Sequence, residues 1–323
     1  MKRFNKLAVP DVGTGNGRRV LEARATANLD VHQHLWPPRL LEALRARDKP
    51  PRLRGWTLEL PGEQPYDVDP SDHDPLARRA QARAEGLDLA LIAPSSPLGI
   101  ELLPPSEARD LLDAYHDGAL ELPEPFGAWA GACMTEIDPE ALRHQLDRGF
   151  VGLALPANAL CAEQGYVRVA PLLDVLEDAG RPLFIHPGPA AAPRSAPPWW
   201  PTIVSYVQQM YETWFAFRMF GRPRHRALRV CFAMLAGLAP LHGERLLARA
   251  GLRTVIDQDA FLDVSSYGTR AIDATVRVLG IDVLVGGSDC PYASPPFADL
   301  GPAAVAAIRG ANPLRLLDRK GGL

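Results

Sequence analysis

Two histidines that could bind a metal stand at the end of a short apolar run near the start of the chain. The run is Asn28-Leu29-Asp30-Val31-His32-Gln33-His34-Leu35-Trp36, and two prolines follow it directly. On a β-strand, residues two apart point to the same face, so His32 and His34 are expected to direct both imidazoles into one space. The prolines would end the strand there. Such a pair is a half-site for a divalent transition metal, and the alternative is a pair of surface or core histidines.

Two further candidate ligands occur where other apolar runs end. His186 ends the run Pro182-Leu183-Phe184-Ile185, and Asp289 follows a run that begins at Val283. The carboxyl ends of parallel strands meet at one rim of a barrel, where active sites lie. Three histidines and a carboxylate would meet there, which predicts metal binding. The predicted ligands are His32, His34, His186 and Asp289.

These residues are positioned by a repeated alternation of strands and helices. After the first run, seven more apolar runs of strand length recur between Leu87 and Gly287, and a helical segment follows each. Eight such units predict a closed (β/α)8 barrel. The alternative is an open doubly wound sheet, but the glycine-rich stretch Gly13-Thr14-Gly15-Asn16-Gly17 follows no predicted strand. Helices are expected at 39–47, 75–85, 106–120, 139–148, 168–179, 202–220, 241–250, 270–279 and 303–309.

The barrel is predicted to span residues 28–318, with a flexible leader at residues 1–27 and a tail at residues 319–323. Residues 50–75 form an insertion after the first helix. In this insertion, Trp56-Thr57-Leu58-Glu59-Leu60 and the following Pro61-Gly62 predict a small β-hairpin that could cover the rim.

Composition limits the partners. The chain has 323 residues, of which 47% are hydrophobic and 23% charged, and a net charge of −3. This balance gives no reason to expect binding to nucleic acid or to an anionic membrane, and no apolar run reaches the ~18 residues of a membrane span. The leader lacks the apolar segment of a secretory signal. The four cysteines are scattered, which is typical of reduced thiols in a cytoplasmic protein. A small-molecule substrate is therefore the expected partner, and a homodimer is left open.

Taken together, several motifs resemble the amidohydrolase superfamily, in its amidohydrolase-2 branch of metal-dependent hydrolases and decarboxylases. The resemblance covers about residues 28–318. It implies a (β/α)8 barrel in which the predicted ligands hold one divalent metal, most often zinc, with manganese or iron as alternatives. The motifs are Asp30-Val31-His32-Gln33-His34, Phe184-Ile185-His186-Pro187, Gly287-Ser288-Asp289-Cys290-Pro291 and Asn312-Pro313-Leu314-Arg315-Leu316-Leu317.

One position departs from that branch. Its members commonly have a histidine at the end of the sixth strand, and here Met234 occupies the aligned position. A thioether cannot transfer protons, which argues against the usual decarboxylase mechanism. His242 is a candidate replacement acid, and the alternative is that it caps the next helix or faces solvent. The strand-four lysine that bridges two metals in other amidohydrolases is also missing from Leu153-Ala154-Leu155-Pro156, which argues against a binuclear site.

The expected reaction follows from the predicted metal site. A metal-activated water would hydrolyse a C–N or C–O bond in a small amide or lactone, with Asp289 as ligand and proton shuttle. The first alternative is non-oxidative decarboxylation of a small aromatic or unsaturated acid. The second is a binding relative without turnover. The candidate substrate-binding residues are Trp36, Trp199, Trp200, Met234 and Arg194.

Overall fold

The computed structural model describes residues 27–61, 63–191, 193, 195–294, 297 and 300–317, so most of the predicted leader and all of the predicted tail lie outside the described residues. Its central strands form a three-stranded and a five-stranded parallel sheet. The first sheet has the order β1 (Leu29–Gln33), β5 (Leu89–Ile92), β6 (Phe126–Ala128). The second has the order β11 (Leu284–Val285), β10 (Ala260–Asp263), β9 (Val230–Phe232), β8 (Leu183–His186), β7 (Leu153–Pro156).

Backbone contacts join the two sheets at both edges. The amide of Val31 in β1 donates to the carbonyl of Gly286, just after β11, at 2.8 Å. At the other edge, Ala130 and Leu153 pair as a parallel bridge between the β6 and β7 segments. The carboxyl ends of β1 and β11, which carry the first and last predicted ligands, therefore lie side by side.

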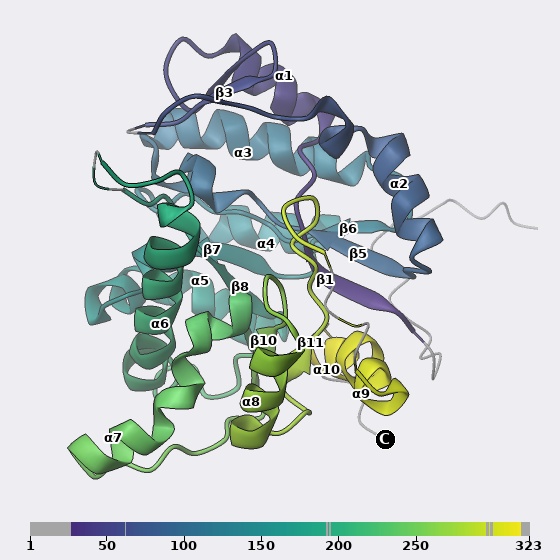
Figure 1. Ribbon diagram of the computed structural model, residues 1–323. Helices are drawn as coiled ribbons and strands as arrows, with labels where there is room; N and C mark the ends of the chain where they lie inside the picture. Colours follow the sequence, from purple (N-terminus) through teal and green to yellow (C-terminus); the bar gives the residue numbers. More distant parts are fainter. Residues whose placement is uncertain are drawn as a thin grey trace, which may run out of the picture.

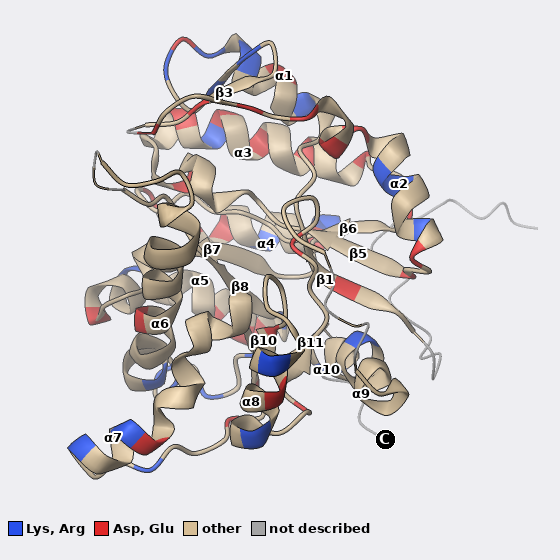
Figure 2. Cartoon of the chain, viewed as in Figure 1, with Lys and Arg blue, Asp and Glu red and all other residues tan. Residues whose placement is uncertain are grey.

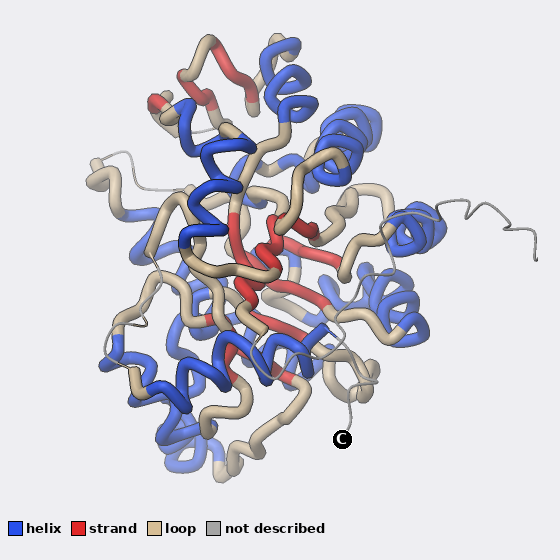
Figure 3. Tube along the Cα trace, turned by 90° about the vertical axis from the view of Figure 1, so that its right-hand side faces the viewer, coloured by secondary structure: helices blue, strands red, loops and turns tan. Residues whose placement is uncertain are grey.

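Helices surround these strands (Figure 1), and a view turned by 90° shows the strands inside and the helices outside (Figure 3). Charged residues lie mainly on the helices and loops (Figure 2). This distribution is expected for parallel strands that are covered on their outer face. The helices are α1 (Pro38–Ala46), α2 (Pro75–Ala84), α3 (Pro105–Leu120), α4 (Pro139–Arg148), α5 (Glu163–Ala179), α6 (Tyr206–Ala216), α7 (Gly243–Ala250), α8 (Thr269–Leu279), α9 (Pro302–Ala306) and α10 (Asn312–Leu317).

Aspartate-proline pairs start two of the helices. The Asp74 carboxylate accepts hydrogen bonds from the amides of Leu76 and Ala77, and Asp138 caps α4 in the same way. A proline at the first helical position loses no hydrogen bond, because that amide has no partner inside the helix. These local signals explain why the expected starts of α2 and α4 agree with the structure.

Three expected helices differ from the structure at their ends. The one expected at 303–309 consists of α9, which ends at Ala306, and a π-helical turn at residues 307–311. Helix α5 begins at Glu163 instead of residue 168. The expected helix at 202–220 consists of α6 with a π-helical turn on either side, at residues 201–205 and 217–221. Within the described residues, no helix is both long enough and apolar enough to cross a membrane.

The insertion after α1 contains a small antiparallel sheet of β2 (Arg52–Arg54), β3 (Thr57–Glu59) and β4 (Tyr66–Asp67). A tight turn at Gly55-Trp56 joins β2 to β3, and the expected Pro61-Gly62 falls in the longer connection between the antiparallel strands β3 and β4, where Gly62 lies outside the described residues. Gly55 has a φ of +65°, which a glycine adopts without steric cost. Strand β3, which follows Gly55-Trp56, is the middle strand of the three.

Candidate metal centre and pocket

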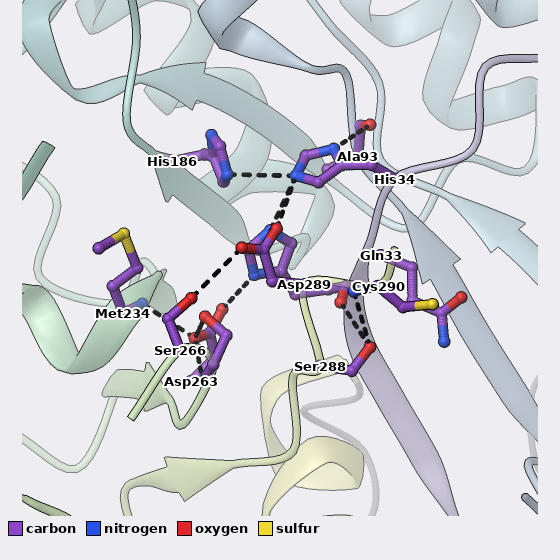
Figure 4. A network of polar contacts seen from close by, with 12 residues as sticks. Gln33, His34, Ala93, His186, Met234, Asp263, Ser266, Ser288, Asp289 and Cys290 are labelled. Atoms are coloured by element: carbon purple, nitrogen blue, oxygen red, sulfur yellow. Dashed lines mark hydrogen bonds and ion pairs between the residues drawn. The ribbon is translucent and has the colours of Figure 1, made fainter. Parts of the chain in front are cut away.

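The four predicted ligands lie together. One donor atom from each of His32, His34, His186 and Asp289 falls within 4.8 Å of the others. The Nε2 atom of His34 is 3.1 Å from that of His32 and 3.2 Å from that of His186. Figure 4 shows His34, His186 and Asp289 directed toward a common point. Ligands about 2.1 Å from one metal ion stand roughly 3.0–3.4 Å apart, so this spacing suits a single ion.

The other ring nitrogen of each histidine has an acceptor. Nδ1 of His32 is 2.7 Å from a carboxylate oxygen of Asp263. Nδ1 of His34 is 3.3 Å from the carbonyl of Ala93, and Nδ1 of His186 is 2.8 Å from the carbonyl of Pro187. A carbonyl or carboxylate can only accept, so each Nδ1 atom carries a proton and the Nε2 atoms face one another. When all three imidazoles are neutral, the Nε2 atoms and the Asp289 carboxylate are converging acceptors, an arrangement that a cation completes.

Burial and charge act in opposite directions on these groups. Burial lowers the pKa of His34 and of His186, so both imidazoles are neutral, as a metal ligand must be. Burial also opposes protonation of His32, but the carboxylates of Asp263 and Asp289 outweigh it and raise its pKa to about 9. A proton on His32 therefore takes the place of a cation, and a metal ion that binds must displace it. Burial raises the pKa of Asp289, but the three histidines overcome this and the net shift is downward.

Asp263 was not singled out as a functional residue by the sequence. Its side chain is fully buried at the end of β10. One oxygen holds Nδ1 of His32, and the other accepts from the backbone amides of Met234 at 2.9 Å and Ser265 at 3.0 Å and from the Ser265 hydroxyl at 2.5 Å. This carboxylate fixes the ring orientation of His32. Its position at the end of an apolar run was the available signal.

Close packing at the base of the site requires glycine. A Cβ at Gly287 would lie 2.9 Å from the Cβ atoms of both His32 and Asp263. Asp289, two residues later, has a φ of +60°, which non-glycine residues rarely adopt. The Gly-Gly-Ser-Asp sequence therefore allows β11 to approach β1 and β10 and turns the Asp289 carboxylate toward the histidines.

A cavity of about 700 Å³ opens above this cluster. His34, His186 and Asp289 contribute to its lining, and apolar and aromatic side chains form most of the rest. A largely apolar cavity with a few converging polar groups is typical of a small-molecule site. The bulky wall residues are Trp36, Tyr66, Tyr206, Met234, Tyr267 and Tyr292.

Neither a protein-family model nor a curated protein matches the sequence. Solved structures do match. IDCase from Metarhizium anisopliae is 19% identical, with 91% of this chain and 98% of that chain covered and a TM-score of 0.73. An amidohydrolase II structure is 18% identical, with 90% and 99% covered and a TM-score of 0.69. The chain has an amidohydrolase fold. The resemblance that the sequence motifs indicated is therefore confirmed at the level of the fold.

A third structure with this fold contains a metal. It is 5-carboxyvanillate decarboxylase from Novosphingobium aromaticivorans, complexed with manganese and 4-hydroxy-3-methoxy-5-nitrobenzoic acid. It is 16% identical, with 90% of this chain and 96% of that chain covered and a TM-score of 0.65. At such identities the comparison shows that the fold is shared, and it does not show which reaction this chain catalyses.

Two of the expected substrate-binding residues of this amidohydrolase fold lie at the pocket. Trp36 lines it, and its indole nitrogen donates to the Ser95 hydroxyl at 2.8 Å, which in turn lies 3.2 Å from Nδ1 of His34. Met234 also lines it and begins a turn in which residues 234–238 have φ values between 48° and 61°. This left-handed turn directs the thioether into the pocket beside the histidines.

Three other expected residues lie away from the pocket. His242 is exposed, is not part of the pocket lining, and packs edge-on against Tyr211 at 5.1 Å. It cannot serve as the replacement acid from this position. Trp199 and Trp200 stack on each other at 6.0 Å outside the lining, and Trp199 is 55% exposed. Arg194 lies outside the described residues.

Proposed function

We propose that the protein is a metal-dependent, non-oxidative decarboxylase of the amidohydrolase-2 branch that acts on a small aromatic or unsaturated acid. The observation that carries this proposal is the set of three imidazole nitrogens and one carboxylate at the base of an aromatic-walled cavity. The proposal includes closure of the two sheets into one (β/α)8 barrel, supported by the backbone contacts at both edges. Several solved structures with this fold are decarboxylases, which favours this reaction over the hydrolysis expected first.

The proposed ligands are His32, His34, His186 and Asp289, which offer Nε2 atoms and a carboxylate oxygen. A bound divalent cation would hold the substrate's oxygen atoms and stabilise the negative charge that develops as the carboxylate leaves. Manganese is the first metal to test, because it is present in the related decarboxylase structure. Zinc, the metal expected from the resemblance, is equally compatible with a site of three imidazoles and one carboxylate.

Asp289 is the proposed proton shuttle. The neighbouring histidines outweigh the effect of burial and lower its pKa, so it is ionised before substrate binds. It can accept a proton from an acidic hydroxyl of the substrate and return it to the ring carbon. The C–C bond to the carboxylate then breaks, carbon dioxide leaves, and a C–H bond replaces it. The hydroxyl of Ser266, 3.4 Å from the second carboxylate oxygen, helps to orient Asp289.

The pocket walls suit a flat ring. Trp36 is 2% exposed and Met234 is 9% exposed, so both present fixed apolar surfaces beside the metal ligands. Apolar walls exclude water, which strengthens electrostatic interactions and limits competing hydrolysis. Because Met234 cannot exchange protons, Asp289 would carry out the proton transfer without help from this position.

The test is to load the purified protein with Mn²⁺ and incubate it with a panel of hydroxybenzoic acids and a matched panel of amides and lactones. Release of carbon dioxide, with formation of the decarboxylated ring, supports the proposal. Loss of that activity in Asp289→Asn, with metal still bound, assigns the proton transfer. Hydrolysis of amides or lactones without carbon dioxide would instead support the first expected reaction. Ligand binding without any product would indicate a binding relative.

A further inference from the structure

A buried arginine contacts the ends of the two strands that carry three of the four proposed ligands. Arg78 belongs to α2 and is 3% exposed. One guanidinium nitrogen donates to the carbonyl of His34 at 2.8 Å. The other donates to the carbonyl of Cys290 at 3.3 Å, beside Asp289. One side chain therefore links the backbone that carries a histidine ligand to the backbone that carries the aspartate ligand.

The guanidinium is also connected to a buried carboxylate through a glutamine. Arg78 donates to the side-chain oxygen of Gln33 at 2.8 Å, and the amide nitrogen of Gln33 donates to Asp30 at 2.8 Å. Burying a cation costs several kcal/mol unless hydrogen bonds compensate it. A charged side chain at this depth is therefore expected to have a role beyond filling space.

The network returns from Asp30 to the ligand-bearing backbone. The other oxygen of Asp30 accepts from the amides of His32 and Ser288, each at 3.1 Å. Ser288 immediately precedes Asp289, and its hydroxyl accepts from the amide of Cys290 at 3.0 Å. Figure 4 shows Gln33, Ser288 and Cys290 beside Asp289. The residues on both sides of Asp289 are thus held by side chains that connect to Arg78.

The backbone of Asp289 needs such support. Its φ of +60° is unfavourable for a residue with a Cβ and persists only where the surroundings enforce it. The amide of Asp289 donates to the carbonyl of His32 at 2.9 Å, and the amide of His34 donates to the carbonyl of Cys290 at 2.7 Å. Arg78, which belongs to α2, donates to this same carbonyl of Cys290.

We propose that Arg78 is a positioning residue for the metal centre, which fixes Asp289 and His34 in their ligand positions before the metal binds. This inference depends on the proposed metal centre. Arg78 is not among the pocket-lining residues, and within the described part of the chain its hydrogen bonds go to backbone carbonyls and to the Gln33 side chain, so it acts on the proposed ligands through the backbone that carries them. Lysine is not an equivalent substitute, because its single ammonium cannot reach acceptors on both sides as the planar guanidinium does.

The test compares Arg78→Met and Arg78→Lys with Arg83→Met, a control on the exposed side of the same helix. Circular dichroism and thermal unfolding of the metal-free proteins measure folding. Titration with Mn²⁺, monitored by the electron paramagnetic resonance of the free ion, measures affinity. The visible spectrum of the Co²⁺-loaded protein reports the ligand geometry.

We expect both Arg78 variants to bind Mn²⁺ about 10- to 100-fold more weakly than wild type and to show an altered Co²⁺ spectrum, with Arg83→Met unchanged. If Arg78→Met does not fold, Arg78→Lys decides the question. A folded Arg78 variant with wild-type Mn²⁺ affinity and an unchanged Co²⁺ spectrum would overturn the inference, even if it unfolds at a lower temperature. Failure of the wild-type protein to bind either metal would instead refute the proposed metal centre.

Discussion

Replacing Asp263 by asparagine tests how the site controls the protonation of His32, a proposed metal ligand. One oxygen of Asp263 accepts three hydrogen bonds, from the amide of Met234 and from the amide and hydroxyl of Ser265, and the other faces Nδ1 of His32 at 2.7 Å. In Asp263→Asn the amide oxygen is expected to keep the three bonds. The amide nitrogen, which can only donate, would then face His32.

The imidazole of His32 would respond by changing its tautomer. Nδ1 would accept from the new amide, and the proton would move to Nε2, the atom proposed to bind the metal. To bind metal, His32 would have to return the proton to Nδ1. This would break a buried hydrogen bond and place the N–H of His32 against the N–H of the new amide, at a cost of about 1.5–3 kcal/mol. We therefore expect Asp263→Asn to fold normally and to bind a divalent metal about 10- to 100-fold more weakly.

The assay is a Mn²⁺ titration of the metal-free variant, with circular dichroism to confirm the fold. Asp259→Asn is the matched control, because Asp259 directly precedes β10 at the end opposite to Asp263. Its affinity should equal that of wild type. If folded Asp263→Asn binds Mn²⁺ within about twofold of wild type, the Asp263 carboxylate does not control the His32 tautomer and the reasoning fails.

Three other predictions concern the pocket, the proton and pH. Trp199→Ala should leave kcat/KM unchanged because this exposed side chain lies outside the pocket, whereas Trp36→Ala should lower the free energy of unfolding by about 3–5 kcal/mol in denaturant titrations. Asp289→Asn should retain metal but reduce single-turnover decarboxylation by about 10²–10⁴-fold, and equal rates would exclude a proton-transfer role. Burial raises the pKa of Glu101 above its value in the unfolded chain, so the folded protein binds this proton more tightly and stability should fall as pH rises above the unfolded value of about 4.3. Glu101→Gln should then be more stable than wild type at pH ~8, with the difference vanishing near pH ~4 in urea unfolding, and a constant difference would contradict this sign.

The arrangement of elements and the four proposed ligands were accessible from sequence because both depend on local signals. Apolar runs of strand length alternate with helical segments. His186 ends one such run, and His34 and Asp289 each follow one. In parallel strands these ends must meet. Local sequence patterns therefore predicted that residues far apart in the chain lie together, because the carboxyl ends of parallel barrel strands meet at one rim.

Where tertiary packing decides, the predictions differed from the structure. Helix α5 starts at Glu163, earlier than expected, and includes Gly165, a poor helix former that gives no local helix signal. Gly165 packs so closely in the first turn that a Cβ there would lie 2.2 Å from the carbonyl oxygen of Ala159. Trp199 and Trp200 follow a proline-rich loop whose path no local pattern determines. The positions of Asp263 and Arg78 beside the ligands depend on contacts across more than 40 residues of sequence. A homodimer and a cytoplasmic location stay predictions.

The most direct test of the proposed metal centre is the metal content of the protein, purified without chelators, measured by elemental mass spectrometry together with its thermal stability. The proposal predicts about one manganese, zinc or iron per chain, less metal in His186→Ala, and a higher melting temperature when Mn²⁺ or Zn²⁺ is added to the chelated protein. A metal-free protein whose melting temperature does not respond to either ion would contradict the metal centre and the decarboxylase mechanism that depends on it.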